Sequence, residues 1–253
     1  MKPQRLIASL LILSLTAFTS TVQADVKLHG LFSDHAVLLS GAAVPVWGWA
    51  DAGENVEVSF AGQTKSATPD ANGKWMVKLD ALKAEAKPQE LTVKGKNTLT
   101  VKDVLVGEVW LGSGQSNMAL PVSKANDYEK EMGAAQFPQL RMFSVRSKPS
   151  ATASENCGGK WSVCSPETVG GFSAALHFFG REIHKTLGVP TGLINSSVNG
   201  TRIERWSAPD AQVPDAAADP AEKSRCGELF NGKIAPLIPY AIRQLEWHRF
   251  QNV

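Results

Sequence analysis

Apolar and polar residues alternate with a period of two over the first part of the chain, from about residue 25 to residue 103. Val56, Val58 and Phe60 alternate with polar residues, and the same spacing recurs in three later segments, at Trp75–Leu79, Leu91–Val93 and Leu99–Val101. Such alternation is typical of strands with one buried face. Short strands at regular intervals predict a β-sandwich over residues 25–103.

Two features inside this β-region carry further information. Turn-forming segments separate the strands, and in one of them, "PDANGK", the pair Asn72-Gly73 favours a tight hairpin turn. Trp47 and Trp49 in "VPVWGWA" lie on the same face of one strand. They fit either a sugar-stacking platform or a buried core, and a core is the more common fate of such pairs.

The pattern changes at Val104. Residues Val104 to Leu111 form a nearly continuous apolar run, as in a strand that is covered on both faces. A helix is predicted over Ser173–Leu187, where apolar residues recur at spacings of three and four and Gly188 follows as a C-cap. The segment "VPTGLINSS" then predicts another buried strand, whereas "APLIPYAI" fits either a helix start or a strand. Strand, helix and strand in this order indicate an α/β fold with a parallel sheet over residues 104–253.

Residues 1–24 have the pattern of a signal peptide. A basic head at Met1–Arg5 precedes an apolar run at Leu6–Phe18, and Val22-Gln23-Ala24 forms an Ala-ended cleavage site. The apolar run is short for a membrane-spanning helix, and no cysteine stands near the cleavage site to carry a lipid. We expect export to a periplasm or secretion, without a membrane anchor.

The charge of the chain limits its partners. Of 26 basic residues, two (Lys2 and Arg5) lie in the leader, which leaves 24 basic and 24 acidic residues and a net charge of zero. A neutral protein has no broad basic surface, so nucleic acid is not an expected partner. The oligomeric state stays open.

Export permits disulfides, and the chain has three cysteines. Cys157 and Cys164 flank "GGKWSV", whose glycines allow a tight loop, so these two are the expected pair. Cys226 then pairs with a segment or partner outside this chain, or is a buried thiol. None of the cysteine spacings fits a zinc site, and we expect no metal or other cofactor.

A serine in a glycine-rich turn is the main candidate for chemistry. Ser116 in "LGSGQSNM" follows an apolar strand, at the edge where open parallel sheets bind ligands. It is either a nucleophile or a simple helix N-cap. A second strand ends before Asn199-Gly200, and a right-handed crossover places both loops at one edge. The turn is not the α/β-hydrolase nucleophile elbow, because position 118 is Met.

The segments "LFSDHAVLL", "DVLVGEVWLGSGQSNM", "GLINSSVNGTRIERW" and "LFNGKIAPLIPYAIR" together resemble the sialate O-acetylesterase family, a member of the SGNH group of carbohydrate esterases. The resemblance implies an SGNH-type parallel sheet after an accessory β-sandwich. It also implies that Ser116 is the nucleophile and that Gly200 contributes to the oxyanion hole. We assign the neighbouring Gln115 and Asn117 to substrate binding. The implied substrate is an O-acetylated sugar, sialic acid or a related one.

The resemblance ends after Arg243, where the chain reads "QLEWHRFQNV". The family's catalytic histidine belongs to a downstream Asp-x-x-His segment that this sequence does not contain. We therefore expect a truncated or frameshifted domain, incomplete at its C-terminal end. None of the five histidines is an evident substitute: His29, His35, His177, His184 and His248. Alternatives are an inactive remnant, a sugar-binding module and an acetylxylan-type esterase.

We predict that the mature protein begins near Asp25, because the basic head, apolar run and Ala24 together form a signal peptidase substrate. N-terminal sequencing of the exported protein tests this. Recovery of soluble protein that retains Met1 would show that residues 1–24 are not a cleaved signal.

Overall fold

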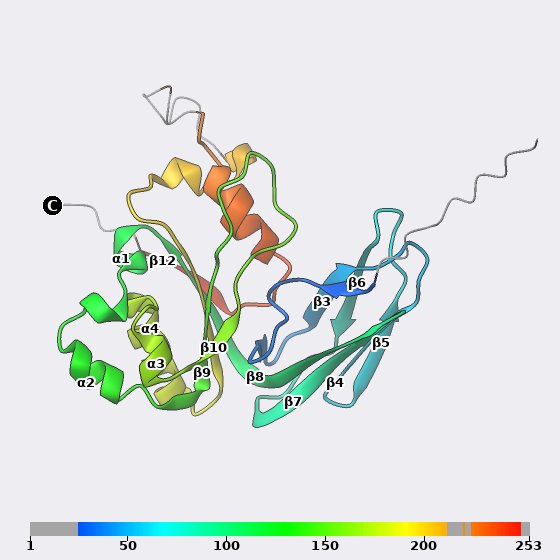
Figure 1. Cartoon of the computed structure of the whole chain (residues 1–253), viewed down its shortest axis with the longest axis horizontal. Coiled ribbons are helices and arrows are strands. Elements are labelled where there is room, and N and C mark those ends of the chain that lie inside the picture. The colour runs from blue at the N-terminus through cyan, green and yellow to red at the C-terminus, as the bar shows by residue number, and fades with distance from the viewer. Residues whose placement is uncertain (1–24, 212–219, 221–223, 249–253) are drawn as a thin grey trace, which may run out of the picture.

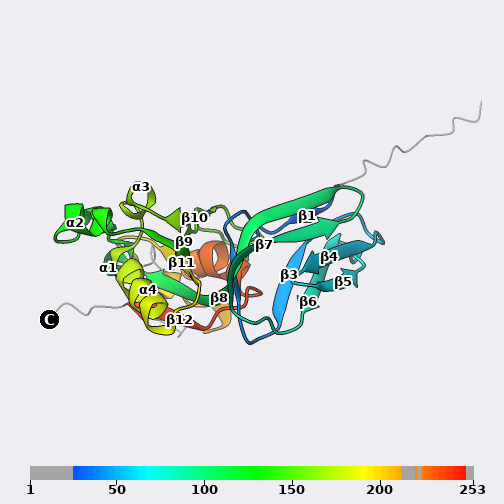
Figure 2. The same cartoon turned by 90° about the horizontal axis from the view of Figure 1, so that it is seen from below.

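The computed structural model describes residues 25–211, 220 and 224–248, and the predicted signal peptide lies outside these ranges. The described chain forms a β-region and an α/β region side by side (Figure 1). A single long strand, β8 (Thr98–Gly114), runs through both regions (Figures 1 and 2). None of the helices in the described residues is long and apolar enough to cross a membrane.

The β-region consists of two packed sheets. The smaller has the strand order β1-β3-β6, and it packs on strands β5, β4, β7 and the first half of β8 from a nine-stranded sheet. In β4, which belongs to the nine-stranded sheet, the alternating residues Val56, Val58 and Phe60 are all buried, as the pattern predicts. The bounds are β1 Lys27–Leu28, β2 Val37–Leu39, β3 Val44–Trp49, β4 Val56–Phe60, β5 Gln63–Ala67, β6 Lys74–Leu79 and β7 Glu85–Lys94.

The hairpin predicted at Asn72-Gly73 is wrong in its connectivity. A turn is present, since the Gly73 N–H donates to the Asp70 carbonyl and Gly73 has a φ of 75°. It links β5 to β6, however, and these two strands belong to different sheets. The tight hairpin instead joins β4 to β5 through Ala61 and Gly62, whose φ values of 49° and 76° match a two-residue turn with both centres in the left-handed region.

The α/β class predicted from the sequence is confirmed. The second half of β8 pairs in parallel with β11 and with β12, and β11 pairs in parallel with β9. β10 pairs antiparallel with β9, at the outer edge. The bounds are β9 Phe137–Ser144, β10 Trp161–Cys164, β11 Thr191–Ser197, β12 Gln244–His248, α1 Ser116–Ala119, α2 Tyr128–Gly133, α3 Pro166–Val169 and α4 Ala174–Leu187.

Both faces of this sheet are covered. In β11, Leu193 packs in the hydrophobic cluster that contains α4, whereas the next residue, Ile194, packs in the main core with Leu237 and Tyr240. Successive residues of a strand point to opposite faces, so a continuous apolar run is what such a strand requires. The segment that contains Leu237 is helical: a π-helical turn at Phe230–Ile234 precedes a 3₁₀ turn at Ala235–Leu237.

Helix α4 forms where its sequence predicts. The Ser173 hydroxyl accepts a hydrogen bond from the Leu176 N–H at the start, and Gly188 ends the helix with a φ of 65°. Gly180 permits close packing on the sheet, because a β-carbon there would lie 2.5 Å from Leu193 side-chain atoms. The helix therefore sits directly against β11.

The predicted disulfide between Cys157 and Cys164 is wrong, since both are free thiols. Cys157 packs in the main core, whereas Cys164 lies in the second cluster with its Sγ 3.9 Å from His177 Nδ1. Strand β10 holds residues 161–164 extended, so the chain before Cys164 does not form the tight loop that a bond to Cys157 would need. Burial raises the pKa of each of these two thiols to about 12. Cys226 is half-buried.

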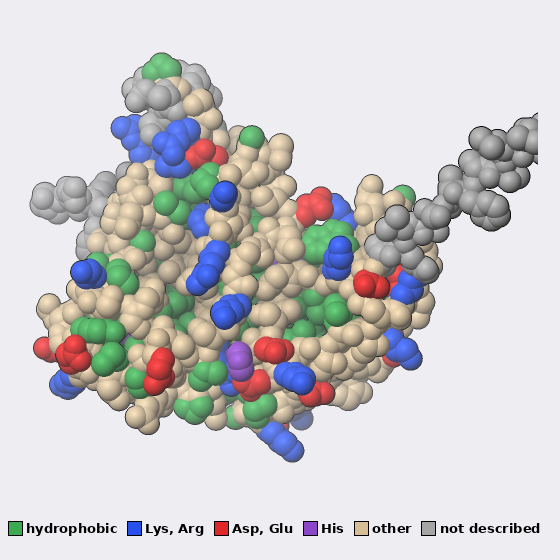
Figure 3. Space-filling model, viewed as in Figure 1, with side chains coloured by type: hydrophobic (Ala, Val, Ile, Leu, Met, Phe, Trp, Pro, Cys, Tyr) green, Lys and Arg blue, Asp and Glu red, His purple; other side chains and the backbone are tan. Residues whose placement is uncertain are grey.

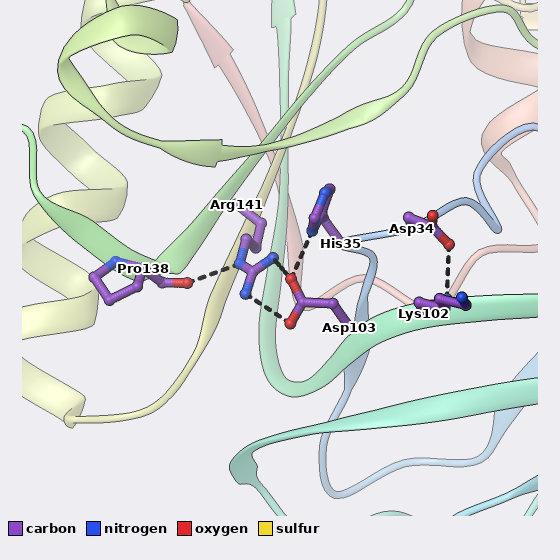
Figure 4. Close-up of polar contacts among 6 residues, drawn as sticks. All are labelled: Asp34, His35, Lys102, Asp103, Pro138 and Arg141. Carbon is purple, nitrogen blue, oxygen red and sulfur yellow. Dashed lines mark hydrogen bonds and ion pairs between the residues drawn. The ribbon is translucent and has the colours of Figure 1, made fainter.

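An ion-pair cluster fixes the junction between the two regions (Figure 4). Asp103, at the point where β8 passes from one region to the other, accepts two hydrogen bonds from Arg141 of β9, at 2.5 and 3.1 Å. The same carboxylate bonds to His35 Nδ1 at 2.6 Å, and Arg141 Nε donates to the Pro138 carbonyl. His35 and Asp103 both have positive φ values, 71° and 54°. Strained backbone of this kind persists only where surrounding contacts hold it.

The charge state of Asp103 follows from its partners. Partial burial opposes ionisation, but the hydrogen bonds from Arg141 and His35 outweigh it and hold the pKa of Asp103 below its ordinary value of 3.8. A carboxyl with a lowered pKa stabilises the fold fully above the ordinary pKa. That stabilisation disappears as the pH falls through the lowered value.

We predict that Asp103→Asn lowers the free energy of unfolding by about 3 kcal/mol at pH 7, because it leaves the buried Arg141 guanidinium without its counter-charge. Asn tolerates a positive φ, so the backbone itself is not strained by the change. Urea titrations should show the deficit shrinking below about pH 4. Asp80→Asn, which removes an exposed partner of Lys65, is the control and should change little. Equal effects of both changes would contradict the role assigned to the cluster.

Candidate active site

The ends of two parallel strands create the candidate site. In the pairing of β8 with β11, Ser197 lies opposite Gly114, and the Val198 N–H donates to the Gly114 carbonyl at 3.0 Å. The chain then leaves both strands at one edge of the sheet. Ser116 and Gly200 therefore stand in neighbouring loops, as the crossover argument predicts.

Ser116 is exposed at this edge. It is the first residue of α1, and its hydroxyl donates to Gln115 Oε1 at 3.2 Å. Ser116 is not the N-cap, because Gln115 occupies that position. Gly114 makes the turn possible: its φ of 135° is one that residues with a side chain rarely adopt. The Ser116 hydroxyl is thus exposed in the turn and does not cap the N-terminus of α1.

A buried methionine anchors the short helix under Ser116. Met118 is 2% exposed and packs against Gly112 and Leu176, so that a β-carbon on Gly112 would lie 2.9 Å from atoms of both side chains. The Ala174 N–H also donates to the Leu120 carbonyl at 2.8 Å, which ties the end of α1 to the start of α4. The methionine that excludes a nucleophile elbow is therefore the residue that positions this serine.

The second loop is held by a chain of hydrogen bonds that the sequence did not indicate. Thr201 Oγ1 donates to the Val198 carbonyl at 2.8 Å, and the buried Trp206 donates its indole N–H to Thr201 Oγ1 at 2.9 Å. Gly200 itself has a φ of 67°, is exposed, and has open space where a β-carbon would stand. Its backbone is accessible to a ligand at the same edge as Ser116.

The remaining polar residues of the two loops have distinct surroundings. Gln115 is half-buried and contacts Ser116, whereas Asn117 is exposed. Their assignment to substrate binding stays a prediction. Ser113 lies behind the turn with a buried hydroxyl that has no partner among the described residues. No cluster of three or more potential metal ligands occurs in the described part of the chain.

The histidines with described side chains do not contact Ser116. Burial lowers the pKa of His29 and of His177 to about 4, so both are neutral core residues. His184 Nδ1 bonds to the Val189 carbonyl at 2.8 Å, and His35 belongs to the junction cluster. Strand β12 places His248 in register with Gly114, at the same sheet edge, but its side chain lies outside what the structure describes.

Several known proteins are similar to this chain in sequence. Over 238 residues, 83% of this chain, the sequence is 32% identical to human sialate O-acetylesterase and 31% identical to the sialate O-acetylesterase of Pongo abelii. The sialate O-acetylesterase of Rattus norvegicus is 35% identical over 188 residues, 67% of this chain. The chain is a homologue of the sialate O-acetylesterases.

The homologues are longer than the matched region. The match covers 46% of the human sialate O-acetylesterase and 34% of the rat one, so the chain spans about half or less of these relatives. Among solved structures, a carbohydrate acetylesterase from Xanthomonas citri matches with a TM-score of 0.80 at 35% identity. That match covers 88% of this chain and 50% of the other. No family model matches the chain.

We predict that Gly112→Ala destabilises this sialate O-acetylesterase homologue by a net amount of about 1 kcal/mol. The added methyl group meets Leu176 and Met118, and overpacking of this kind costs about 1–3 kcal/mol. Replacing glycine within a strand regains only about 0.5–1 kcal/mol. Gly171→Ala is the control, because nothing lies within 4 Å of a β-carbon there. Urea unfolding compares the two; a neutral Gly112→Ala would show that Met118 does not pack against this glycine as described.

Proposed function

We propose that this protein is an exported serine O-acetylesterase that acts on O-acetylated sugars, sialic acid or a related sugar among them. The observation that carries the proposal is the exposed Ser116 hydroxyl beside the Gly200 loop, at the carboxyl edge of the parallel sheet. The relatives named sialate O-acetylesterase and carbohydrate acetylesterase support the substrate class.

The chemistry follows from the two loops. Ser116 Oγ attacks the carbonyl carbon of the acetyl ester, and the backbone N–H groups of Ser116 and Gly200 stabilise the negative charge that develops on the carbonyl oxygen. The sugar oxygen leaves and takes a proton, which leaves the acetyl group on Ser116. Water then attacks this acyl group and releases acetate. Each attack also needs a base that accepts a proton.

The rate of ester hydrolysis depends on a general base that accepts the proton of the Ser116 hydroxyl. Among the described residues, the hydrogen-bond partner of the Ser116 hydroxyl is the Gln115 amide, which is not a base at neutral pH. A serine hydroxyl without a positioned base is a weak nucleophile. Loss of one triad member costs on the order of 10⁴-fold or more in rate. We therefore propose that the 253-residue chain, taken by itself, hydrolyses acetyl esters poorly.

The experiment compares this chain with a chimaera that adds the segment following the matched region of the Xanthomonas citri acetylesterase. We predict that the chimaera hydrolyses 4-nitrophenyl acetate at least about 10³-fold faster than the chain alone, because it regains a positioned base. Ser116→Ala in the chimaera should abolish the gain. As a control, circular dichroism should show that the chimaera is folded and that Ser116→Ala has the same fold as the chimaera without this change.

Two results would decide against this account. If the chain alone is fast and Ser116→Ala stops it, a base is already present, and His248 in register with Gly114 is the next residue to change. If a folded chimaera stays inactive, the alternative of a non-catalytic sugar-binding protein is favoured. Release of acetate from O-acetyl sialic acid, compared with acetylated xylan, separates the two candidate substrates.

A further inference from the structure

A large groove lies between the two regions, away from the Ser116 edge. It has a volume of about 1120 Å³, and its walls come from β1 and β3 on one side and from β10 with the residues around it on the other. None of the residues from Gly112 to Met118, or from Ser197 to Arg202, lines it. The groove is therefore distinct from the candidate active site.

One wall combines an aromatic ring with a cation. Trp49 is half-buried, unlike its neighbour Trp47, which packs in the core against His29 and Phe32. Lys27 lies directly opposite Trp49 in the antiparallel pairing of β1 with β3, so both side chains stand on one face. A flat apolar ring beside an ammonium group suits a ligand with both an apolar face and a negative charge.

The opposite wall adds further donors. Lys160 is exposed and lines the groove. The side-chain oxygen Oδ1 of Asn156 accepts hydrogen bonds from the Gly30 and Cys157 N–H groups, at 2.8 and 2.9 Å, which leaves the side-chain N–H₂ of Asn156 to donate. Neither Lys27 nor Lys160 has an acidic partner in the described part of the chain. This part of the groove thus presents the Lys27 and Lys160 ammonium groups and the Asn156 amide as donors.

Among the described residues that line the groove, acidic side chains are fewer than basic ones. Asp34 is the one carboxylate among them; it accepts a hydrogen bond from the backbone N–H of Lys102 at 2.7 Å and keeps its negative charge, so the two lysines of the lining outnumber it. Asp103 is neutralised by Arg141. On the face shown in Figure 3, Lys and Arg side chains lie over the loop that joins β9 to β10, and acidic side chains lie below them beside a histidine. Arg146 in this loop is exposed and borders a neighbouring hollow that also contains Lys160.

We infer that this groove binds an oligosaccharide that carries carboxylate groups. The Trp49 ring stacks on the apolar face of one sugar, and the Lys27 and Lys160 ammonium groups bind carboxylates of the chain. The choice of a sugar rather than another polyanion rests on the proposed function. The groove would bind one part of an acidic glycan while an acetyl ester on another part of the same glycan is hydrolysed at the Ser116 edge.

The test measures binding by isothermal titration calorimetry with Ser116→Ala protein, so that a failure of the proposed esterase activity leaves the result unaffected. The probes are a hexamer of N-acetylneuraminic acid, a hexamer of galacturonic acid, neutral xylohexaose and inorganic polyphosphate. The variants are Lys27→Glu with Lys160→Glu, Trp49→Leu and Trp49→Phe. Lys78→Glu, an exposed lysine of β6 outside the groove, is the matched control.

At least one acidic hexamer should bind, and the double charge reversal should weaken its binding by about tenfold or more. Trp49→Leu should also weaken it, whereas Trp49→Phe and Lys78→Glu should not. Binding should fall as salt is raised. Near-ultraviolet circular dichroism checks that each variant is folded.

Four outcomes would overturn the inference. The first is that both acidic hexamers fail to bind at millimolar concentration, and the second is that xylohexaose binds as well as they do. The third is that polyphosphate binds as tightly as the acidic hexamers and Trp49→Leu has no effect, which would indicate a surface that binds polyanions in general, nucleic acid among them. The fourth is that Lys78→Glu weakens binding as much as the groove variants do, which would place the binding site outside the groove.

Discussion

The hydrogen-bonded pairing along strand β8 is the constraint on which the rest of the structure depends. Its first half pairs with β7 in the β-region, and its second half pairs in parallel with β11. The two parts of the nine-stranded sheet differ in direction, so the strand that both parts share must bend (Figures 1 and 2). The bend occurs at Asp103, whose positive φ is held by Arg141 and His35. The ion pair therefore fixes the orientation of the α/β region relative to the β-region.

The same pairing determines where chemistry can occur. Because β8 and β11 are parallel and in register, the loops that follow them must leave at one edge, and Ser116 and Gly200 become neighbours without any direct bond between them. Small residues complete the arrangement: Gly112 admits Met118 beneath the turn, and Gly114 allows the chain to leave the strand. Backbone geometry alone thus brings the proposed nucleophile and the proposed oxyanion donors to one edge of the sheet, whereas a base requires a side chain from another element.

Features with a local cause could be predicted from the sequence. The period of two in β4, the apolar run in β8, and the Ser173 and Gly188 caps of α4 each depend on residues close in the chain. The disulfide and the Asn72-Gly73 hairpin were wrong because they depend on which strands pair, and local spacing does not determine that. The hydrogen-bonded ion pair between Asp103 and Arg141 joins residues 38 positions apart, and no pattern in the sequence predicts it.

Net charge is a poor guide to local charge in this protein. Residues 25–253 include equal numbers of acidic and basic residues, yet several acids are paired within the structure: Asp103 with Arg141, Glu108 with Arg243, and Glu131 with Arg181. Each pair cancels charge in one place without supplying an acid to the groove. Lys27 beside the half-buried Trp49 ring, and Lys160 on the opposite wall, consequently remain without an acidic partner in the described residues. A balanced composition excludes a broad basic surface, but it does not exclude a narrow cationic groove, because the positions of the charges, rather than their sum, determine what a groove can bind.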